Sequence, residues 1–245
     1  FFNLTSGTIL GEYYNQPIGD WNVSEVTSMR NMFSGSKFNQ DIGNWDVGNV
    51  TDMWAMFLGS EFNKPIDGWN VSEVTNMGMM FFNTQFNQPL GSWDVGKVTN
   101  MWSMFQSSPF DQPIGEWNVG SVTTMWAMFY NSPFNQPIGN WDVGKVTVTR
   151  SMFFNTPFNQ PIHNWDVSYV TDMNQMFSNT PFNQPIGNWD VSNVTDMSLM
   201  FFNSPSFNQD LSKWCVTKIP RIPSGFSTGA IAWLLPQPVW GTCPD

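Results

Sequence analysis

The chain contains little charge, and most of that charge is negative. Only 11% of its 245 residues are charged, against about 25% in an average soluble domain. Nine Lys and Arg stand against 19 Asp and Glu, which gives a formal charge of −10. Nucleic-acid binding depends on clustered Lys and Arg that neutralise phosphates. We therefore expect no nucleic-acid partner.

Histidine and long apolar runs are scarce as well. His163 is the only histidine, so one chain cannot complete a His-based metal cluster or a Ser-His-Asp set. We interpret it as a residue tolerated at a bend. No uninterrupted apolar stretch approaches the roughly 18 residues of a membrane span. We therefore expect a non-enzymatic protein with no catalytic residue, no cofactor, no metal and no membrane span.

The two cysteines lie close to one end of the chain. Cys215 and Cys243 both fall near the C-terminus, outside the regular part of the sequence. Two lone thiols in an aromatic-rich end predict a disulfide, which implies an oxidising compartment. The alternative is a pair of buried free thiols.

Most of the chain consists of nine copies of one motif. Each copy follows F-N-Q-P-I-G-x-W-[DN]-V-[SG]-x-V-T-x-M-x-x-M-F, and its tryptophan recurs at a constant interval. A period of roughly 20–50 residues is typical of proteins in which each unit buries its apolar face against its neighbours. We therefore predict one elongated body. The Trp column comprises Trp21, Trp45, Trp69, Trp93, Trp117, Trp141, Trp165, Trp189 and, after one inserted residue, Trp214.

The apolar positions in each copy predict a strand followed by a helix. Residues 50–57 are apolar at i, i+3, i+6 and i+7, which is the stripe of a short helix, and a Thr hydroxyl would cap it. The preceding N-Q-P-I-G-x-W predicts a short parallel strand. The predicted fold is an α/β solenoid of nine 24-residue coils, with a degenerate half-coil at 1–13, the repeat at 14–217 and a disulfide-bonded cap at 218–245. The Thr column comprises Thr27, Thr51, Thr75, Thr99, Thr123, Thr147, Thr171 and Thr195.

Identical polar side chains from successive coils would meet in register, because stacked strands lie about 4.8 Å apart. We predict an Asn column and a Gln column that hydrogen-bond from coil to coil. A Pro before each Ile means that the strand starts near it, and a Gly after the Ile indicates a bend or a close approach. Asp or Asn after the Trp indicates an Asx-turn. The Asn column comprises Asn39, Asn63, Asn87, Asn135, Asn159 and Asn183, and the Gln column Gln88, Gln112, Gln136, Gln160 and Gln184.

Two variable columns predict an interaction surface. The position after the first Met of M-x-x-M-F tolerates Gly, Arg, Asn and Ser, so it faces solvent, and three copies place Trp there. Exposed aromatic rings on a low-charge body mark a contact surface for sugar faces or protein hot spots. The alternative is that these rings pack along the ridge against one another. The predicted ligand or partner surface comprises Trp54, Trp102, Trp126, Phe82, Tyr130 and Phe154.

Three further patterns have a simple structural explanation. Asp142, Asp166 and Asp190 follow successive tryptophans and could hold Ca²⁺ as a carboxylate ladder, but Asn fills the same position elsewhere, so we favour a turn. The Thr column could form an ice-binding array, but we favour helix capping. Sequons in the repeat arise readily by chance. The possible glycosylation sites are Asn3, Asn22, Asn49, Asn70 and Asn193.

The motif W-[DN]-V-S-x-V-T-[DN]-M-x-x-M-F, with F-N-Q-[PD]-I-G between copies, resembles the repeat of BspA-like surface proteins, which was first noted in Mycoplasma. The resemblance covers about residues 14–217. Because that family is grouped with leucine-rich repeats, it implies a leucine-rich-repeat-like solenoid, a secreted or cell-surface location and a role in adhesion. The C-terminal residues look like the ends of such arrays, which supports pairing Cys215 with Cys243. Thr149, which takes a Met position, and His163 depart from the pattern.

We therefore expect a non-enzymatic extracellular or cell-surface protein for adhesion to, or recognition of, protein or glycan on a cell surface or matrix. One alternative is a self-assembling structural subunit of a surface filament or sheet. A carbohydrate-active enzyme is less favoured, because a regular stack has no evident cleft between two carboxylates.

Overall fold

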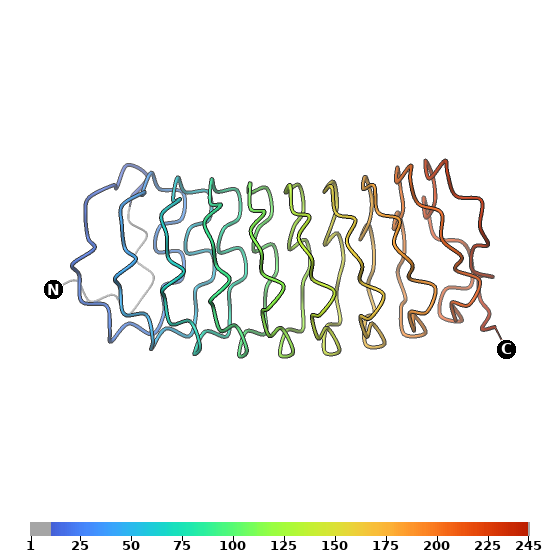
Figure 1. Cartoon of the computed structure of the whole chain (residues 1–245), viewed down its shortest axis with the longest axis horizontal. Helices are drawn as coiled ribbons and strands as arrows, with labels where there is room; N and C mark the ends of the chain where they lie inside the picture. Colours follow the sequence, from blue (N-terminus) through green and yellow to red (C-terminus); the bar gives the residue numbers. More distant parts are fainter. Residues whose placement is uncertain (1–10, 245) are drawn as a thin grey trace.

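The chain forms an elongated stack of coils that follow one another along its long axis (Figure 1). The structure is a computed structural model that describes residues 11–244. Isolated parallel bridges join equivalent residues of successive copies, from the pair of Ser28 and Asp52 to the pair of Asp172 and Asp196. The predicted 24-residue repeat is therefore confirmed, and each copy of the motif is one coil.

The predicted coil of one strand and one helix is wrong. Residues 11–244 contain no helix, and no strand beyond the isolated bridges. The apolar spacing of residues 50–57 belongs instead to overlapping tight turns, in which residues three apart also meet on one side. Eight residues are too few for a helix to be stable by itself, so the bonds that this segment makes to its neighbours decide its conformation.

In these turns, backbone amides bond alternately within the coil and to the next coil. The N–H of Met56 donates to the carbonyl of Met53 at 3.1 Å, whereas the N–H of Ala55 donates to the carbonyl of Gly78, one coil further on, at 2.9 Å. Ala55 has a φ of 53°, which is the positive φ that the third residue of a type II turn requires. An α-helix uses its amides internally and could not link the coils in this way.

The Thr column links coils and does not cap helices. Thr51 donates its N–H to the carbonyl of Thr27 in the preceding coil at 2.8 Å, and its hydroxyl donates to the same oxygen at 3.2 Å. The same pair of bonds joins Thr195 to Thr171 at the other end of the column. Thr therefore recurs because its backbone and hydroxyl both bond to the coil before it.

The strand expected in N-Q-P-I-G-x-W is also absent, because a side chain replaces the backbone acceptor there. The Oδ1 of Asn135 accepts the N–H of Asn159 at 2.9 Å and the Nε2 of Gln160 at 3.2 Å. The Asn and Gln columns thus bond from coil to coil as predicted, although the bonds run to Asn Oδ1 and not between like amides. The Pro that follows, which has no N–H, needs no partner in this ladder.

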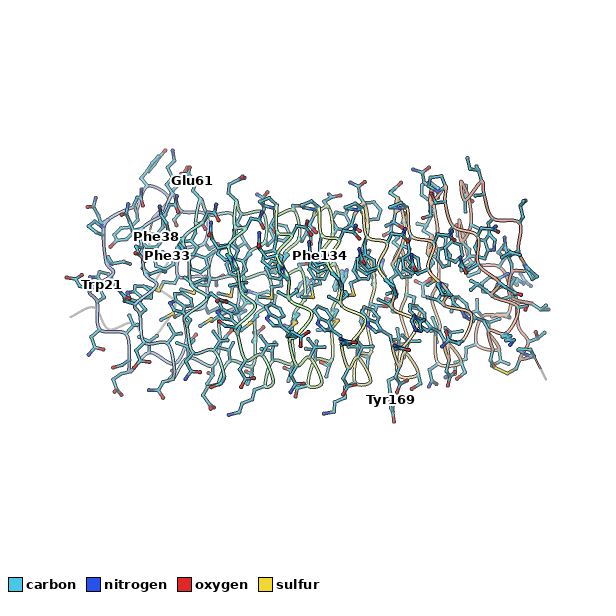
Figure 2. All side chains as sticks on the ribbon, viewed as in Figure 1. Trp21, Phe33, Phe38, Glu61, Phe134 and Tyr169 are labelled. Atoms are coloured by element: carbon cyan, nitrogen blue, oxygen red, sulfur yellow. A yellow bond between two sulfur atoms is a disulfide. The ribbon has the colours of Figure 1, made fainter. Side chains whose placement is uncertain are left out.

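Three aromatic columns form the core. Phe129 and Phe134 stack within one coil with ring centroids 3.8 Å apart, and Phe134 lies 6.4 Å from Phe158 in the next coil. Trp141 is 3% exposed and donates its indole N–H to the carbonyl of Ile114 at 3.1 Å. Figure 2 shows Phe134 inside the rod and Tyr169 projecting from it. Each coil therefore covers the apolar rings of its neighbour.

The glycine after the Ile is needed for close approach between coils. A Cβ on Gly115 would lie 2.6 Å from the carbonyl oxygen of Pro137 in the next coil. This distance is shorter than a Cβ permits, so the predicted close approach is confirmed at Gly115. A glycine is not needed in every coil, because Asp67 and His163 take the same position in theirs, and the side chain of His163 is exposed.

An end segment, residues 211–244, closes the C-terminal end of the stack (Figure 1). Trp233 lies at the end of one Phe column, with its ring 4.7 Å from that of Phe207, and its indole N–H donates to the carbonyl of Gln209 at 3.0 Å. Cys215 and Cys243 form a disulfide, as predicted. The predicted half-coil at 1–13 lies mostly outside the described residues.

Candidate functional site

The three ridge tryptophans lie together on the outside of the rod. The rings of Trp102 and Trp126, one coil apart, stack at 5.0 Å with an interplanar angle of 11°, and Trp54 lies 5.3 Å from Trp102 although two coils separate them. Trp54 crosses the intervening coil because Gly78 has no side chain: a Cβ there would lie 2.6 Å from the Cζ3 of Trp54. The guanidinium of Arg30 lies 5.0 Å from the Trp54 ring. Gly78 itself is buried beneath Trp54, so the glycine at this position makes room for a neighbouring ring and is not the sign of solvent exposure that we had expected.

The second variable column runs beside this ridge. Tyr130 and Phe154 stack at 4.4 Å with an interplanar angle of 7°, and Phe82 occupies the same position two coils before Tyr130. All three side chains are half-buried. The two aromatic columns are therefore parallel walls that follow the long axis.

A shallow groove of about 340 Å³ lies between these walls. Its floor is the turn position that needs a positive φ, which is Met79 at one end of the groove and then the small residues Ser103, Ala127 and Ser151. The hydroxyl of Ser103 donates to the Oε1 of Gln106 at 2.7 Å. The aromatic groove is lined by Met79, Phe82, Trp102, Ser103, Gln106, Trp126, Ala127, Tyr130 and Ser151.

The structure brings four of the six predicted surface residues into the groove. Phe82, Trp102, Trp126 and Tyr130 line it, whereas Trp54 and Phe154 pack against its ends. The small residues of the floor were missed, although a Ser or Ala directly after a ridge tryptophan is a signal that could have found them. Trp126 is 40% exposed, so ring packing along the ridge and exposure to solvent both occur.

The stacking decides which part of each ring meets a ligand. Parallel rings with centroids 4.4 to 5.0 Å apart must lie face to face, because coplanar rings cannot approach so closely. The faces between Trp102 and Trp126, and between Tyr130 and Phe154, are therefore occupied. The walls of the groove therefore combine ring edges with the ring faces that lie outside these two stacks.

Charged groups flank the groove but do not line it. The guanidinium of Arg150, which follows Trp126 along the ridge, lies 3.5 Å from the carboxylate of Asp172. Burial raises the pKa of Asp196, but hydrogen bonds from Ser198 and Asn174 and the charge of Arg150 outweigh it, so the pKa falls below its usual value. The groove itself is uncharged, which favours an apolar or neutral ligand.

An Asx position holds the backbone of the ridge in place. The carboxylate of Asp52 accepts the N–H of Trp54 at 2.9 Å, and the side chain of Asn100 accepts the N–H of Trp102 at 2.9 Å. The Asp or Asn two residues before each of these tryptophans therefore fixes where its side chain leaves the coil.

The column of Asp142, Asp166 and Asp190 serves turns, as we favoured. Asp142 accepts the N–H of Gly144 at 3.1 Å, and Asp166 accepts that of Ser168 at 3.0 Å. The hydroxyl and the amide of Ser168 lower the pKa of Asp166. Residues 11–244 hold no group of three or more His, Cys, Asp or Glu arranged to bind a metal ion.

The four described sequon asparagines fall into two classes. The Nδ2 atoms of Asn49 and Asn193 donate to carbonyls in the preceding coil at 2.8 and 2.7 Å. Asn22 and Asn70 are exposed, and each accepts the hydroxyl of its own sequon serine at 2.8 Å. Asn3 lies outside the described residues. A search of residues 11–244 for a helix that could cross a membrane finds none.

Comparison with known families gives one match. The model of the family described as "Mycoplasma protein of unknown function, DUF285" matches four overlapping segments, residues 8–109, 59–157, 82–180 and 131–231. No curated protein matches the chain. Because the family matches cover most of the repeat, the chain belongs to the DUF285 family.

Proposed function

We propose that this member of the DUF285 family is a non-enzymatic recognition or adhesion protein that acts outside the cell or on its surface. It holds a partner, protein or glycan, along the aromatic groove. We further propose that it is a BspA-like protein whose stack is a variant of the leucine-rich-repeat type, with turns in place of strands and helices.

The aromatic groove carries this proposal. The groove gathers four aromatic side chains on one part of the surface, and it leaves Trp126 40% exposed. Tyr and Trp dominate binding hot spots because they bury a large apolar area with few rotatable bonds. The groove follows the long axis, so it suits an extended segment of a partner.

The stacking of the rings favours a protein segment over a glycan. A sugar binds aromatic residues through the ring face, and the faces that Trp102 and Trp126 turn to each other, and that Tyr130 turns to Phe154, are already covered. Ring edges and a floor of Ser and Ala suit aliphatic and aromatic side chains of an extended peptide. The disulfide between Cys215 and Cys243 supports an oxidising location.

A test compares the groove variant Trp102→Ala/Trp126→Ala with the unchanged chain against a displayed peptide library and a glycan array. We expect the unchanged chain to select peptides that carry apolar side chains, and the variant to bind them at least tenfold more weakly, as for a hot spot. The matched control is Tyr169→Ala, which removes an exposed aromatic side chain outside the groove.

Thermal unfolding of each variant must stay cooperative, so that weaker binding reports the surface and not the fold. Peptide binding that is equal in both proteins would remove the groove from the proposal. Glycan binding that is lost in the variant would keep the recognition function but replace the protein partner.

A further inference from the structure

The end segment exposes more large aliphatic side chains than the rest of the described chain. Leu234 and Ile231 are 88% and 82% exposed. Outside the end segment, the exposed large hydrophobic residues of the described chain are all aromatic: Tyr13, Trp126, Tyr169 and Phe202. Exposed apolar side chains that gather in one part of a molecule mark an interaction site, as the rings of the aromatic groove do. The exposed aliphatic residues of the end segment are Ile222, Ile231, Leu234, Leu235 and Val239.

The same end of the rod carries the opposite charge from the remainder. Residues 1–210 contain six Lys and Arg against 18 Asp and Glu, a net charge of −12, whereas residues 211–245 contain three against one, a net charge of +2. Lys213, Lys218 and Arg221 are all exposed. The segment that exposes these aliphatic side chains is therefore cationic on an otherwise acidic molecule.

Leu234 and Leu235 occupy the positions at which earlier coils have Asn and Gln. Their N–H groups donate to the Oδ1 of Asn208 at 2.8 and 3.0 Å, as the N–H of Asn208 donates to the Oδ1 of Asn183 at 2.8 Å. The leucine side chain has no oxygen that could accept a hydrogen bond from a further coil, so the ladder of side-chain acceptors ends there. The exposed leucines thus lie in the outermost layer of the stack, at one end of the rod (Figure 1).

A second copy of the chain fits this surface poorly. Contact between two end segments would bring cations against cations, which costs affinity. Docking of another stack onto the last layer would lack the Oδ1 acceptors, from Asn or in one coil from Asp111, that join the earlier coils. An anionic lipid surface suits both features of the end segment, because its headgroups attract Lys and Arg and its acyl boundary accepts aliphatic side chains.

We propose that the end segment docks on an anionic membrane surface, with Leu234, Leu235 and Ile231 entering the acyl boundary and Lys213 and Arg221 meeting the headgroups. The rod then stands away from the lipid and its groove remains accessible. The attachment is peripheral and reversible, because a few aliphatic side chains and charges bind far more weakly than a membrane-spanning helix.

Flotation with vesicles tests this proposal. The full chain is mixed with vesicles of phosphatidylcholine and phosphatidylglycerol in equal parts, or of phosphatidylcholine alone, at low and at high salt. We expect binding to the anionic vesicles, at least tenfold weaker binding to the neutral ones, and loss of binding at high salt because the headgroup attraction is screened. Leu234→Asn/Leu235→Gln should weaken binding by about tenfold or more, since it removes most of the inserted apolar surface.

That double variant restores the Asn and Gln found at the same positions in other coils, so the fold should be kept. Lys213→Gln/Arg221→Gln should weaken binding and reduce its salt dependence, whereas the control Tyr169→Ser should leave both unchanged. Absence of binding to anionic vesicles, or equal binding by the Asn/Gln variant, would overturn the proposal. So would lipid-free oligomers that the Asn/Gln variant abolishes, since they would identify a second copy as the partner.

Discussion

The middle coils and the end segment stack by different rules. In the middle, Asn135 provides the acceptor for Asn159, and Asn159 provides the next one for Asn183. At the end, Asn208 still provides an acceptor, but Leu234, which donates to it, provides none. Each middle coil therefore offers the next coil the same acceptors that it uses itself, and the end segment does not.

The aromatic rings of the core also pack differently in the middle coils and in the end segment. Phe129 and Phe153, in successive middle coils, are nearly parallel, with an interplanar angle of 9°. At the end, the ring of Trp233 meets Phe207 at 81°. A parallel ring leaves an equivalent face for the next ring, whereas an edge-on ring covers the last face. In proteins that stack in one dimension, stability is the sum of terms between neighbours, so the two regions should respond separately to mutation.

The largest effect should follow removal of a core ring in the middle. Trp117 is 4% exposed, and its indole N–H donates to the carbonyl of Leu90 at 2.9 Å. Trp117→Ala leaves a cavity and removes one of the two hydrogen bonds that the Leu90 carbonyl accepts, the other coming from the N–H of Trp93, and should cost about 3–5 kcal/mol in the free energy of unfolding. Urea denaturation measures it. Trp240→Ala, in the half-buried outer layer, should cost clearly less; an equal cost would contradict the division into two regions.

A smaller and more local effect should follow removal of the disulfide. Cys215 and Cys243 are 28 residues apart, and a bond of this kind contributes about 2–4 kcal/mol. In Cys215→Ser/Cys243→Ser, amide hydrogen exchange should accelerate in residues 211–244, while the middle coils keep their protection. Uniform acceleration along the rod would instead show that the stack unfolds as a single unit.

The smallest effect concerns pH at the border of the two regions. Asp196 is the last residue in the series of parallel bridges and the one nearest to the end segment, and its pKa lies below the usual value. A carboxylate with a lowered folded-state pKa stabilises the protein above its unfolded pKa of about 3.9, and this stability is lost as the pH falls through the folded value. Asp196→Asn should therefore cost under about 1 kcal/mol at pH 7, since solvent screens the site, and this cost should shrink as the pH falls through the folded-state pKa.

Titration of the Asp196 carboxyl by NMR provides a direct measurement. Asn76 shows that the amide fits this column, because it accepts the N–H of Gly78 at 3.2 Å in its own coil. A midpoint at or above the unfolded value, or a stability difference that does not change between pH 7 and pH 2, would be inconsistent with this account.

The aromatic residues of the groove were predictable one by one, but the groove was not. The column of Trp102 and Trp126 was predicted as a contact surface because other copies of the motif have unrelated residues at the same position. That its rings would form one wall, with Ser103 and Ala127 as a floor, depends on a turn with positive φ at those two residues. A helix would have placed the same side chains around a cylinder, without a groove.

The sequence by itself determined that the chain stacks in equivalent layers, one for each copy of the motif. A tryptophan at one constant interval, with Asn and Gln at constant offsets from it, requires equivalent coils in register, and two cysteines beyond the last regular copy indicate a closed end. Only the tertiary structure decided how the backbone runs within a layer. Apolar residues three apart are compatible with a helix and with a run of turns, and the choice depends on whether each amide finds its acceptor inside the coil or in the next one. That acceptor exists only once a second coil is stacked, so a single copy of the motif cannot reveal it.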